Sequence, residues 1–299
     1  LKTISSMRQS LFVCTLLCFT ASLNAQKNEF ANGLYWELNS GVLTISGNGS
    51  IPDYTHPWNG KGNVEKIVIQ DGVTSIGQVT FWEYNKPHHL KSVIIGNSVT
   101  SIGERAFLDC SLLQSVTIGN SVTSIGDCAF NGCTSLQSII IPNSVTYIAQ
   151  DAFSKCPNLQ SIIVPSSATS SANNIMNIAT YGSDKLTVTM LIPGPNNSKY
   201  SIVTERNPLK CGLKNSEGNW VVPMGTYKWI GPFEGNYLKT ADNGKYGLIT
   251  YNGTEVIAPE VDALEQAGKG FLRFKINGFW GVMNYQGKII IPTERGYTK

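Results

Sequence analysis

The chain has 299 residues, of which 14% are charged and 41% are hydrophobic, and its formal net charge is +3. This composition is typical of a globular protein with room for about two domains. The charge is too small for a nucleic-acid-binding protein, which needs a strongly basic surface.

Residues 1–25 have the features of a secretory signal peptide. Arg8 supplies the charged start, and residues 11–23 form an apolar core that ends shortly before Gln26. A transmembrane anchor is the rival, but the apolar stretch is short for a span. A lipoprotein is disfavoured because a leucine precedes Cys18, where a small residue is expected. We therefore expect a mature protein that starts at Gln26 and has no integral membrane span.

Residues 26–63 predict an N-terminal cap. Two runs of alternating apolar residues, 34–38 and 42–46, flank the turn Asn39-Ser40-Gly41 and read as a β-hairpin. Such a hairpin would shield the open end of the first repeat.

Residues 64–193 are organised by a repeat of 23 residues. Near-identical copies begin at Leu90, Leu113 and Leu136, and a fourth opens at Leu159; an irregular turn precedes them. In each copy, alternating apolar residues predict a short strand and an Asn-Ser pair predicts a turn. An Ala-Phe pair then fills the interior, and we expect it on a short helical turn. A fixed period of this length is the signature of a solenoid, so we predict a parallel β ladder with short helical turns.

The cysteines follow the same period. Cys110, Cys133 and Cys156 share one repeat position, which favours buried thiols in a ladder. A disulfide between neighbouring turns would need a specific torsion. Five cysteines follow the signal segment, and an odd number leaves at least one unpaired.

The repeat resembles the BspA-like leucine-rich repeat of bacterial surface proteins. The shared pattern is Leu-x-Ser-Val-x-Ile-Pro-x-Ser-Val-Thr-x-Ile-Gly-x-x-Ala-Phe-x-x-Cys, and it covers about half of the chain. The resemblance implies a leucine-rich-repeat solenoid and attachment to host or matrix proteins. It also implies a secreted protein or one at the bacterial cell surface, with the periplasm as an alternative.

Two segments interrupt the repeat. Three extra residues fall within 82–89, where His88 and His89 are adjacent. No carboxylate or thiolate partner has ligand spacing there, so we expect a surface loop and no metal site. The fourth copy fades into the polar run 166–174, and residues 185–193 predict one more strand.

Residues 194–208 are predicted to be a linker, and residues 209–299 contain a second kind of repeat. The linker opens with Pro, Gly, Asn and Ser residues. Copies around Gly212, Gly247 and Gly281 each continue to a second glycine and a Val/Ile-rich strand that ends in proline. The turns predict an all-β meander. This part resembles the WG repeat, a family without a settled activity.

A catalytic set is not visible in the sequence. The only histidines are His56, His88 and His89, and neither a Gly-x-Ser-x-Gly motif nor a Gly-rich phosphate loop is present. Cys128 and Cys133 are too far apart for a redox pair. A carboxylate pair for sugar cleavage stays open as a minor alternative. We expect no enzyme activity and no cofactor.

Two binding functions remain. The leading hypothesis is protein interaction or adhesion through the solenoid. The alternative is carbohydrate or cell-wall binding through C-terminal aromatic residues, for which packing in hairpin cores is the competing interpretation. These aromatic residues are Trp220, Trp229, Tyr246 and Trp280.

Alternation along each repeat strand predicts which residues face outwards. Small hydroxyls form one column and mostly branched apolar residues the next, almost without charge, which often marks an interaction site. Cover by neighbouring loops or by a dimer partner is the alternative. The predicted partner-binding face consists of Ser92, Ile94, Ser115, Thr117, Ser138, Ile140, Ser161 and Ile163.

Overall fold

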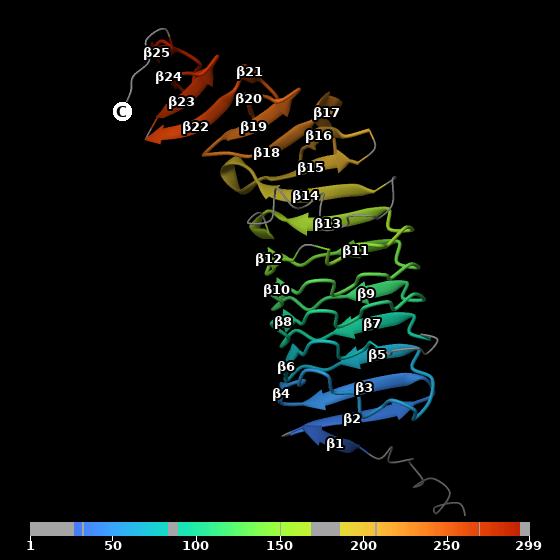
Figure 1. The fold of residues 1–299 in the computed structure, drawn as a ribbon. Coiled ribbons are helices and arrows are strands. Elements are labelled where there is room, and N and C mark those ends of the chain that lie inside the picture. The colour runs from blue at the N-terminus through green and yellow to red at the C-terminus, as the bar shows by residue number, and fades with distance from the viewer. Residues whose placement is uncertain are drawn as a thin grey trace, which may run out of the picture.

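The computed structural model describes residues 27–31, 33–82, 89–149, 151–168, 186–206, 208–268 and 270–293. The expected signal peptide and His88 lie outside these ranges. The described chain is an elongated stack of β strands that begins as a parallel solenoid and ends in antiparallel sheets (Figure 1). No helix in these ranges is long and apolar enough to cross a membrane.

An antiparallel hairpin begins the stack, as the sequence predicts. It joins β2 (Leu34–Asn39) to β3 (Val42–Gly47), and β1 (Asn28–Ala31) pairs with the outer side of β2. Ser40 and Gly41 both have positive φ angles, 46° and 80°, which suits a two-residue hairpin turn. The first solenoid strand then pairs with β3 in parallel, so the hairpin covers the end of the ladder.

One side of the solenoid is a row of parallel strands. Successive strands are in register, so that each inward Ile or Val lies beside its counterpart in the next coil. The ladder pairing is interrupted only between β9 and β11, which lie side by side (Figure 1). The strands of this row are β5 (Lys66–Ile69), β7 (Ser92–Ile95), β9 (Ser115–Thr117), β11 (Ser138–Ile140), β13 (Ser161–Pro165) and β14 (Thr187–Pro193).

A second row of shorter strands forms another side of the solenoid. Val99, Val122 and Val145 precede these strands and are fully buried, and the isoleucine that ends most of the strands is also buried. The strands are β4 (Gly49–Ser50), β6 (Val73–Ile76), β8 (Ser101–Ile102), β10 (Ser124–Ile125) and β12 (Tyr147–Ile148).

The remaining side of each coil consists of tight hydrogen-bonded turns, where the sequence suggests short helices. Arg105, Cys128 and Asp151 have left-handed φ angles of 53°, 53° and 60°, which interrupt a right-handed helix. Backbone hydrogen bonds also run between coils: the amide of Phe107 donates to the carbonyl of Ala129 at 2.8 Å. The Ala-Phe pair still points inwards, so the predicted packing holds although the helix does not form.

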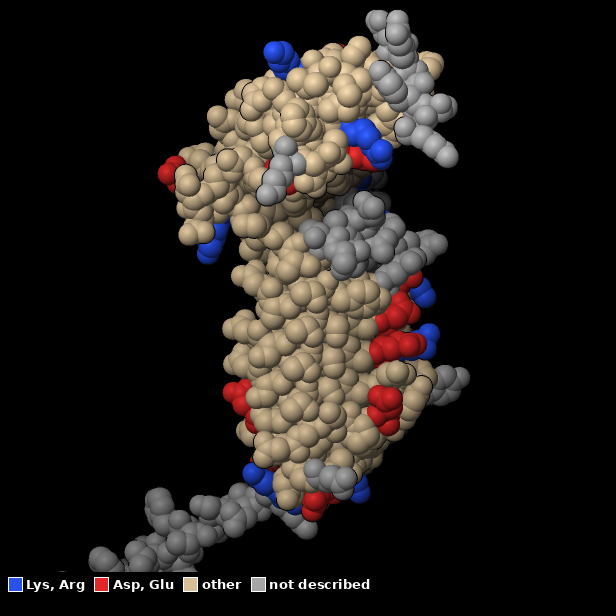
Figure 2. Space-filling view, turned by 90° about the vertical axis from the view of Figure 1, so that its left-hand side faces the viewer, with Lys and Arg blue, Asp and Glu red and all other residues tan. Residues whose placement is uncertain are grey.

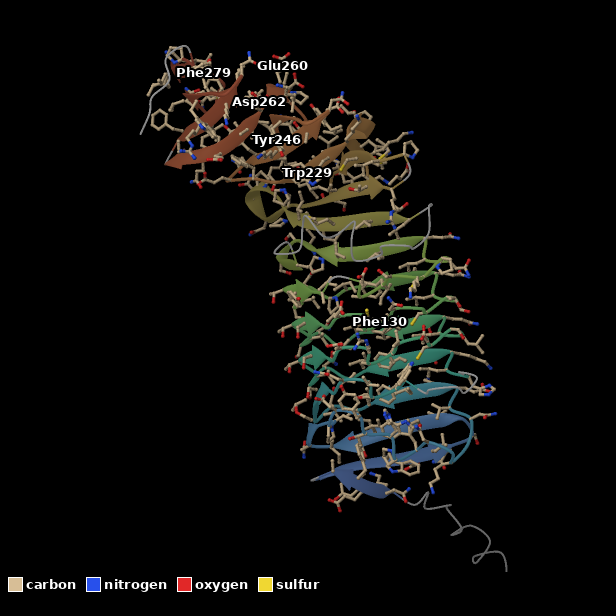
Figure 3. All side chains as sticks on the ribbon, in the orientation of Figure 1. Phe130, Trp229, Tyr246, Glu260, Asp262 and Phe279 are labelled. Atoms are coloured by element: carbon tan, nitrogen blue, oxygen red, sulfur yellow. The ribbon has the colours of Figure 1, made fainter. Side chains whose placement is uncertain are left out.

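Aromatic rings stack through the centre of the solenoid. The centroid distances from Trp58 to Phe81, Phe107, Phe130 and Phe153 are 5.3, 5.0, 5.2 and 5.3 Å in succession. Phe130 is fully buried in the middle of this stack (Figure 3). The period of the coils therefore sets the spacing of the rings.

The repeat cysteines form a ladder of buried thiols beside the rings. The Cys133 thiol donates to the Phe107 carbonyl at 3.4 Å, and the Cys156 thiol donates to the Phe130 carbonyl at 3.3 Å. Burial raises the pKa of Cys133 well above its usual range and that of Cys156 to about 11. Each thiol thus links its own coil to the preceding one.

Three antiparallel meanders of four strands follow the solenoid. The first shares β14 with the solenoid and adds β15 (Lys199–Glu205), β16 (Lys210–Lys214) and β17 (Trp220–Tyr227). The second contains β18 (Trp229–Pro232), β19 (Tyr237–Asp242), β20 (Lys245–Thr250) and β21 (Glu255–Val261). The third contains β22 (Ala263–Gly268), β23 (Phe271–Ile276), β24 (Phe279–Asn284) and β25 (Ile289–Ile291).

The segment predicted as a linker has a different structure. Its first residues form a tight turn with the short 3-10 helix η2 (Pro195–Asn197), closed by the Gly194 amide donating to the Ser198 carbonyl at 2.8 Å. Most of the remainder is β15, which pairs with both β14 and β16. Proline, glycine and asparagine favour turns and linkers alike, so the composition did not distinguish a hairpin from a domain boundary.

Candidate binding face

The eight residues of the predicted face lie in two columns on the outer side of the long-strand row. The first column pairs Ser92 with Ser115, and Ser138 with Ser161, in neighbouring strands. We call the whole set the outer strip: Ser92, Ile94, Ser115, Thr117, Ser138, Ile140, Ser161 and Ile163.

The second column of the outer strip carries the apolar surface. Ile94 is 38% exposed and Ile140 is 65% exposed, whereas Ile163 is half-buried. Thr117 separates the two exposed isoleucines and is itself exposed. No described segment of the chain covers Ile140, which argues against the alternative that neighbouring loops bury the strip.

The strip continues beyond the repeats at both ends. Thr44 of β3 is in register with Val68, which is in register with Ile94. At the other end Ile163 is in register with Thr189 of β14. Sequence reasoning missed Thr44 and Thr189 because β3 and β14 lie outside the 23-residue pattern.

Long polar side chains border the strip on one side. They occupy the position before each repeat strand: Glu65, Lys91, Gln114, Gln137 and Gln160. Lys91 Nζ lies 2.9 Å from Glu65 Oε2, and the hydrogen bond from Lys91 lowers the pKa of the Glu65 carboxyl. The charged pair neutralises itself at one end of the border, so the strip faces solvent with little charge.

The short-strand row presents a different, polar surface. Threonines stack along it: Thr100 Oγ1 donates to the Thr74 carbonyl and Thr123 Oγ1 to the Thr100 carbonyl, both at 3.0 Å. Figure 2 shows that the middle of this side has almost no charged residues and that acidic groups gather along one edge. The threonine hydroxyls are satisfied by the backbone, which fits a role in holding the coils together.

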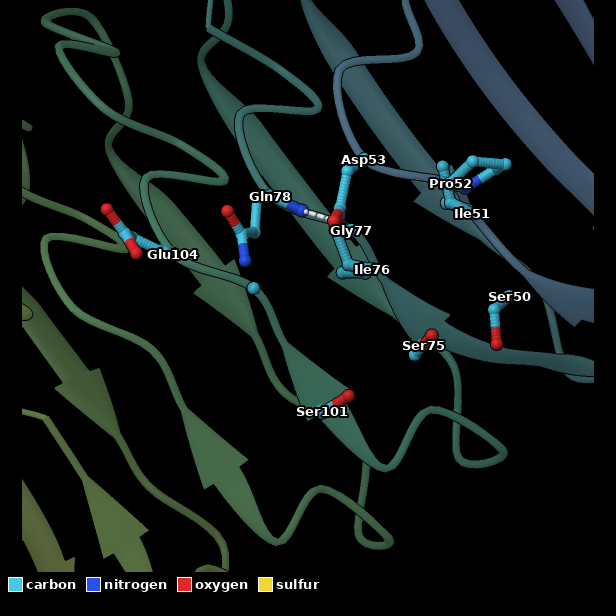
Figure 4. A pocket seen from close by; sticks show the side chains of 11 residues that line it. Ser50, Ile51, Pro52, Asp53, Ser75, Ile76, Gly77, Gln78, Ser101 and Glu104 are labelled. Carbon is cyan, nitrogen blue, oxygen red and sulfur yellow. Dashed lines mark hydrogen bonds between the residues drawn. The ribbon is translucent and has the colours of Figure 1, made fainter.

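A shallow hollow of about 410 Å³ lies at the N-terminal end of that surface (Figure 4). Hydroxyls of Ser50, Ser75 and Ser101 line it, with Asp53 and Glu104 at its rim. Asp53 Oδ1 accepts a bond from the Gln78 backbone amide at 2.7 Å, so this carboxylate has a structural task. The hollow contains residues from three coils, which a repeat pattern alone does not reveal.

The four C-terminal aromatic residues do not form one platform. They lie on three different meanders, and Figure 3 labels Trp229 and Tyr246 on the second. Cations already cover three of the rings: Lys214 lies 4.5 Å from the Trp220 centroid and Lys239 lies 4.0 Å from that of Tyr246. A third, the Trp280 ring, has a guanidinium 4.4 Å from its centroid. A sugar would have to displace these cations to stack on the same faces.

The repeats match known families over most of the chain. The BspA-type leucine-rich repeat matches residues 50–181 in six copies, and the WG-containing repeat matches 212–246, 246–278 and 280–294. The chain is built from BspA-type leucine-rich repeats followed by WG repeats. Leucine-rich-repeat proteins generally bind proteins, and the two families account for both the solenoid and the meanders.

Solved structures of other leucine-rich-repeat proteins are similar to parts of this chain. One from Eubacterium ventriosum is 27% identical over 64% of this chain and 48% of its own, with a TM-score of 0.45. The leucine-rich-repeat protein of T. pallidum is 28% identical over 47% of this chain and 62% of its own, with a TM-score of 0.35. This chain thus spans about half to two thirds of their length. No curated protein sequence matches it.

Proposed function

We propose that this leucine-rich-repeat protein acts outside the cytoplasm as a non-catalytic interaction or adhesion protein that binds a protein partner through the outer strip. The exposure of Ile94 and Ile140 in the middle of a regular sheet carries the proposal. Burial of exposed apolar side chains against a partner removes them from water and so stabilises the complex. The serine hydroxyls beside them supply hydrogen-bonding groups without the desolvation penalty of a charge.

The location rests on the N-terminal segment and on the family. The charged start, apolar core and small residues of 1–25 favour export, and BspA-type repeats favour the bacterial surface. The proposal predicts that secreted protein begins at Gln26. Intact-mass measurement checks this, and recovery of the uncleaved chain from the membrane fraction would contradict it.

The binding test uses the mature protein on an array of immobilised extracellular-matrix proteins beside a glycan array. The test variant replaces Ile94 and Ile140 by lysine, which puts two charges into the middle of the strip. We expect a loss of affinity of about tenfold or more, because central apolar contacts dominate most protein interfaces. The fold should be retained, since both side chains are exposed.

The matched control replaces Leu112 and Tyr147 by lysine. These residues are 42% and 52% exposed and lie outside the strip, so the control adds the same charge to other apolar surface. The control should bind normally. Unfolding of the Ile94/Ile140 variant would show that the strip is core, and normal binding by it would place the partner on another surface. Binding to glycans alone would favour the carbohydrate alternative.

A further inference from the structure

The three meanders are copies of one unit, and equivalent positions can be read from the strand pairing. Gly212, Gly247 and Gly281 pair with Val203, Thr240 and Phe274 respectively. These three residues follow Tyr200, Tyr237 and Phe271 by three positions each. Each unit therefore has the same two faces, one toward the preceding unit and one toward the next; we call the latter its next-facing surface. The second unit covers the next-facing surface of the first, and the third unit covers that of the second.

A glycine turn makes the first contact between units. A Cβ atom on Gly253 would lie 2.8 Å from the Val221 carbonyl oxygen, and one on Gly287 would lie 3.0 Å from that of Val256. Both glycines have positive φ angles, 84° and 77°, which other residues rarely adopt. The turns of the second and third units thus bring their backbones into close contact with the equivalent valine of the preceding unit.

A tyrosine two residues before each turn glycine makes the second contact. Tyr251 packs against Tyr200 with a centroid distance of 5.0 Å, and its hydroxyl donates to the Pro193 carbonyl at 2.9 Å. Tyr285 stacks on Tyr237 at 4.8 Å, and its hydroxyl bonds to a carboxylate of the second unit, that of Glu234. The Tyr-x-Gly turn is therefore used twice in the same way.

Apolar burial and a cation complete the contact between the second and third units. Buried residues of the second unit, including Leu248 and Val261, share a core with buried residues of the third, including Phe274. Lys239 also donates from Nζ to the Leu264 carbonyl of the third unit at 2.9 Å. The next-facing surface of the second unit is thus apolar, with one cation that meets the backbone of the third.

The third unit repeats this next-facing surface and leaves it exposed. Phe271, which is equivalent to Tyr200 and Tyr237, is 43% exposed. Ile290, which is equivalent to Val221 and Val256, is 48% exposed, and its neighbours in β25 are exposed as well. We call this surface the end face: Phe271, Arg273, Trp280, Ile289, Ile290 and Ile291.

We propose that the end face binds a WG-type meander of another polypeptide, whose Tyr-x-Gly turn seats on Phe271 and Ile290. Continuity with the two internal contacts identifies the kind of partner. Arg273 stands where Lys239 stands in the second unit, and its guanidinium is paired with Glu265 of its own unit. Ile290 and Ile291 stand where the first two units have apolar residues that pack against the core: Val221 and Val222 in the first, Val256 and Ile257 in the second.

A second copy of this chain does not offer the required turn. The turns at Gly253 and Gly287 are already engaged with their own preceding units. The remaining turn, at Gly218, is not engaged in this way, because a Cβ atom built there would have no neighbour within 4 Å. This turn, however, has Ser216 in place of the tyrosine. The partner we infer is therefore a different protein that carries a free WG-type unit.

The test supplies such a unit and then releases it. Residues 262–293 are appended a second time after residue 299 of the full chain, with a protease site at the junction. After cleavage, the appended unit should remain bound on gel filtration, and hydrogen exchange across residues 271–293 should slow about tenfold relative to the unextended chain. In a matched control, the appended unit carries alanine and valine at the positions of Tyr285 and Gly287, and it should separate after cleavage.

Variants of the receiving surface complete the test. Ile290→Glu in the original third unit should abolish retention, while its melting curve stays that of the unextended protein because the side chain is exposed. Release of the unmodified unit after cleavage, or equal retention of the control unit, would overturn the proposal. Dimerisation of the unextended protein that Ile290→Glu removes would also overturn it, because a second copy would then occupy the end face.

Discussion

Phe130→Ala should destabilise the solenoid more than Phe153→Ala, the truncation of the last ring of the aromatic stack. The Phe130 ring is fully buried and lies between two parallel neighbours, with centroid distances of 5.2 and 5.3 Å and interplanar angles of 5° and 1°. These separations exceed the carbon contact distance of about 3.5–4 Å, so the rings are offset as aromatic pairs prefer.

The size of the effect follows from the burial and the stacking. Removing a buried phenylalanine side chain costs about 3–5 kcal/mol, of which each stacked pair contributes about 0.5–1.5 kcal/mol beyond area burial. Phe153 is equally buried but stacks on one ring among the described residues. Phe130→Ala should therefore cost about 0.5–1.5 kcal/mol more than Phe153→Ala, which is a large part of a total stability of about 5–15 kcal/mol.

Urea unfolding of the two variants and the unaltered protein measures this difference. Tryptophan fluorescence and far-UV circular dichroism should be followed together, because a repeat protein can unfold in stages when one contact between coils is lost. We expect separate transitions in Phe130→Ala and a single one in the unaltered solenoid. An equal or smaller cost for Phe130→Ala would refute the idea that stacking between coils stabilises the ladder.

Three other outcomes are expected. Cys133 and Cys156 should resist alkylation until the protein unfolds, and Cys133→Ser should lower stability by about 1–3 kcal/mol because it buries a hydroxyl; an unchanged melting temperature would count against this. The hydrogen bond from Lys245 lowers the pKa of Asp262 below its usual 3.8, so the carboxylate stabilises the fold above that pH and the effect is lost as pH falls through the folded pKa; Asp262→Asn should remove this pH dependence of the urea midpoint, and an unaltered pH profile would contradict it. Limited proteolysis should spare residues 199–205, because both edges of β15 are paired; an early cut there, seen by mass spectrometry, would restore the linker interpretation.

The sequence was sufficient to predict the solenoid and the direction of its side chains. A strict 23-residue period allows one arrangement of inward residues per coil, and alternation along a strand separates Ile139 from Ile140. The structure places Ile139 in the core and leaves Ile140 65% exposed. Whether a protein binds there stays a prediction.

Other features depend on geometry that a single repeat does not encode. Left-handed backbone at Arg105 and Cys128 replaces the expected helix, although neither arginine nor cysteine favours such a conformation. The cations that cover Trp220 and Tyr246 come from neighbouring strands, so only the register reveals them. The end face was missed for the same reason: Ile290 looks like any core residue until the strand that should cover it is found to be lacking among the described residues.

The change from parallel to antiparallel pairing at β14 explains why the two repeat families share one sheet. A parallel ladder leaves an open edge at each end, and an open edge invites pairing with other chains. A tight turn can add only an antiparallel strand, since a parallel one needs a long crossover. The chain uses this solution at both ends, with β2 pairing beside β3 and β15 pairing beside β14. The hairpin that protects the last coil is therefore also the start of the first WG unit, and it extends the solenoid core as far as Tyr251 of the second unit.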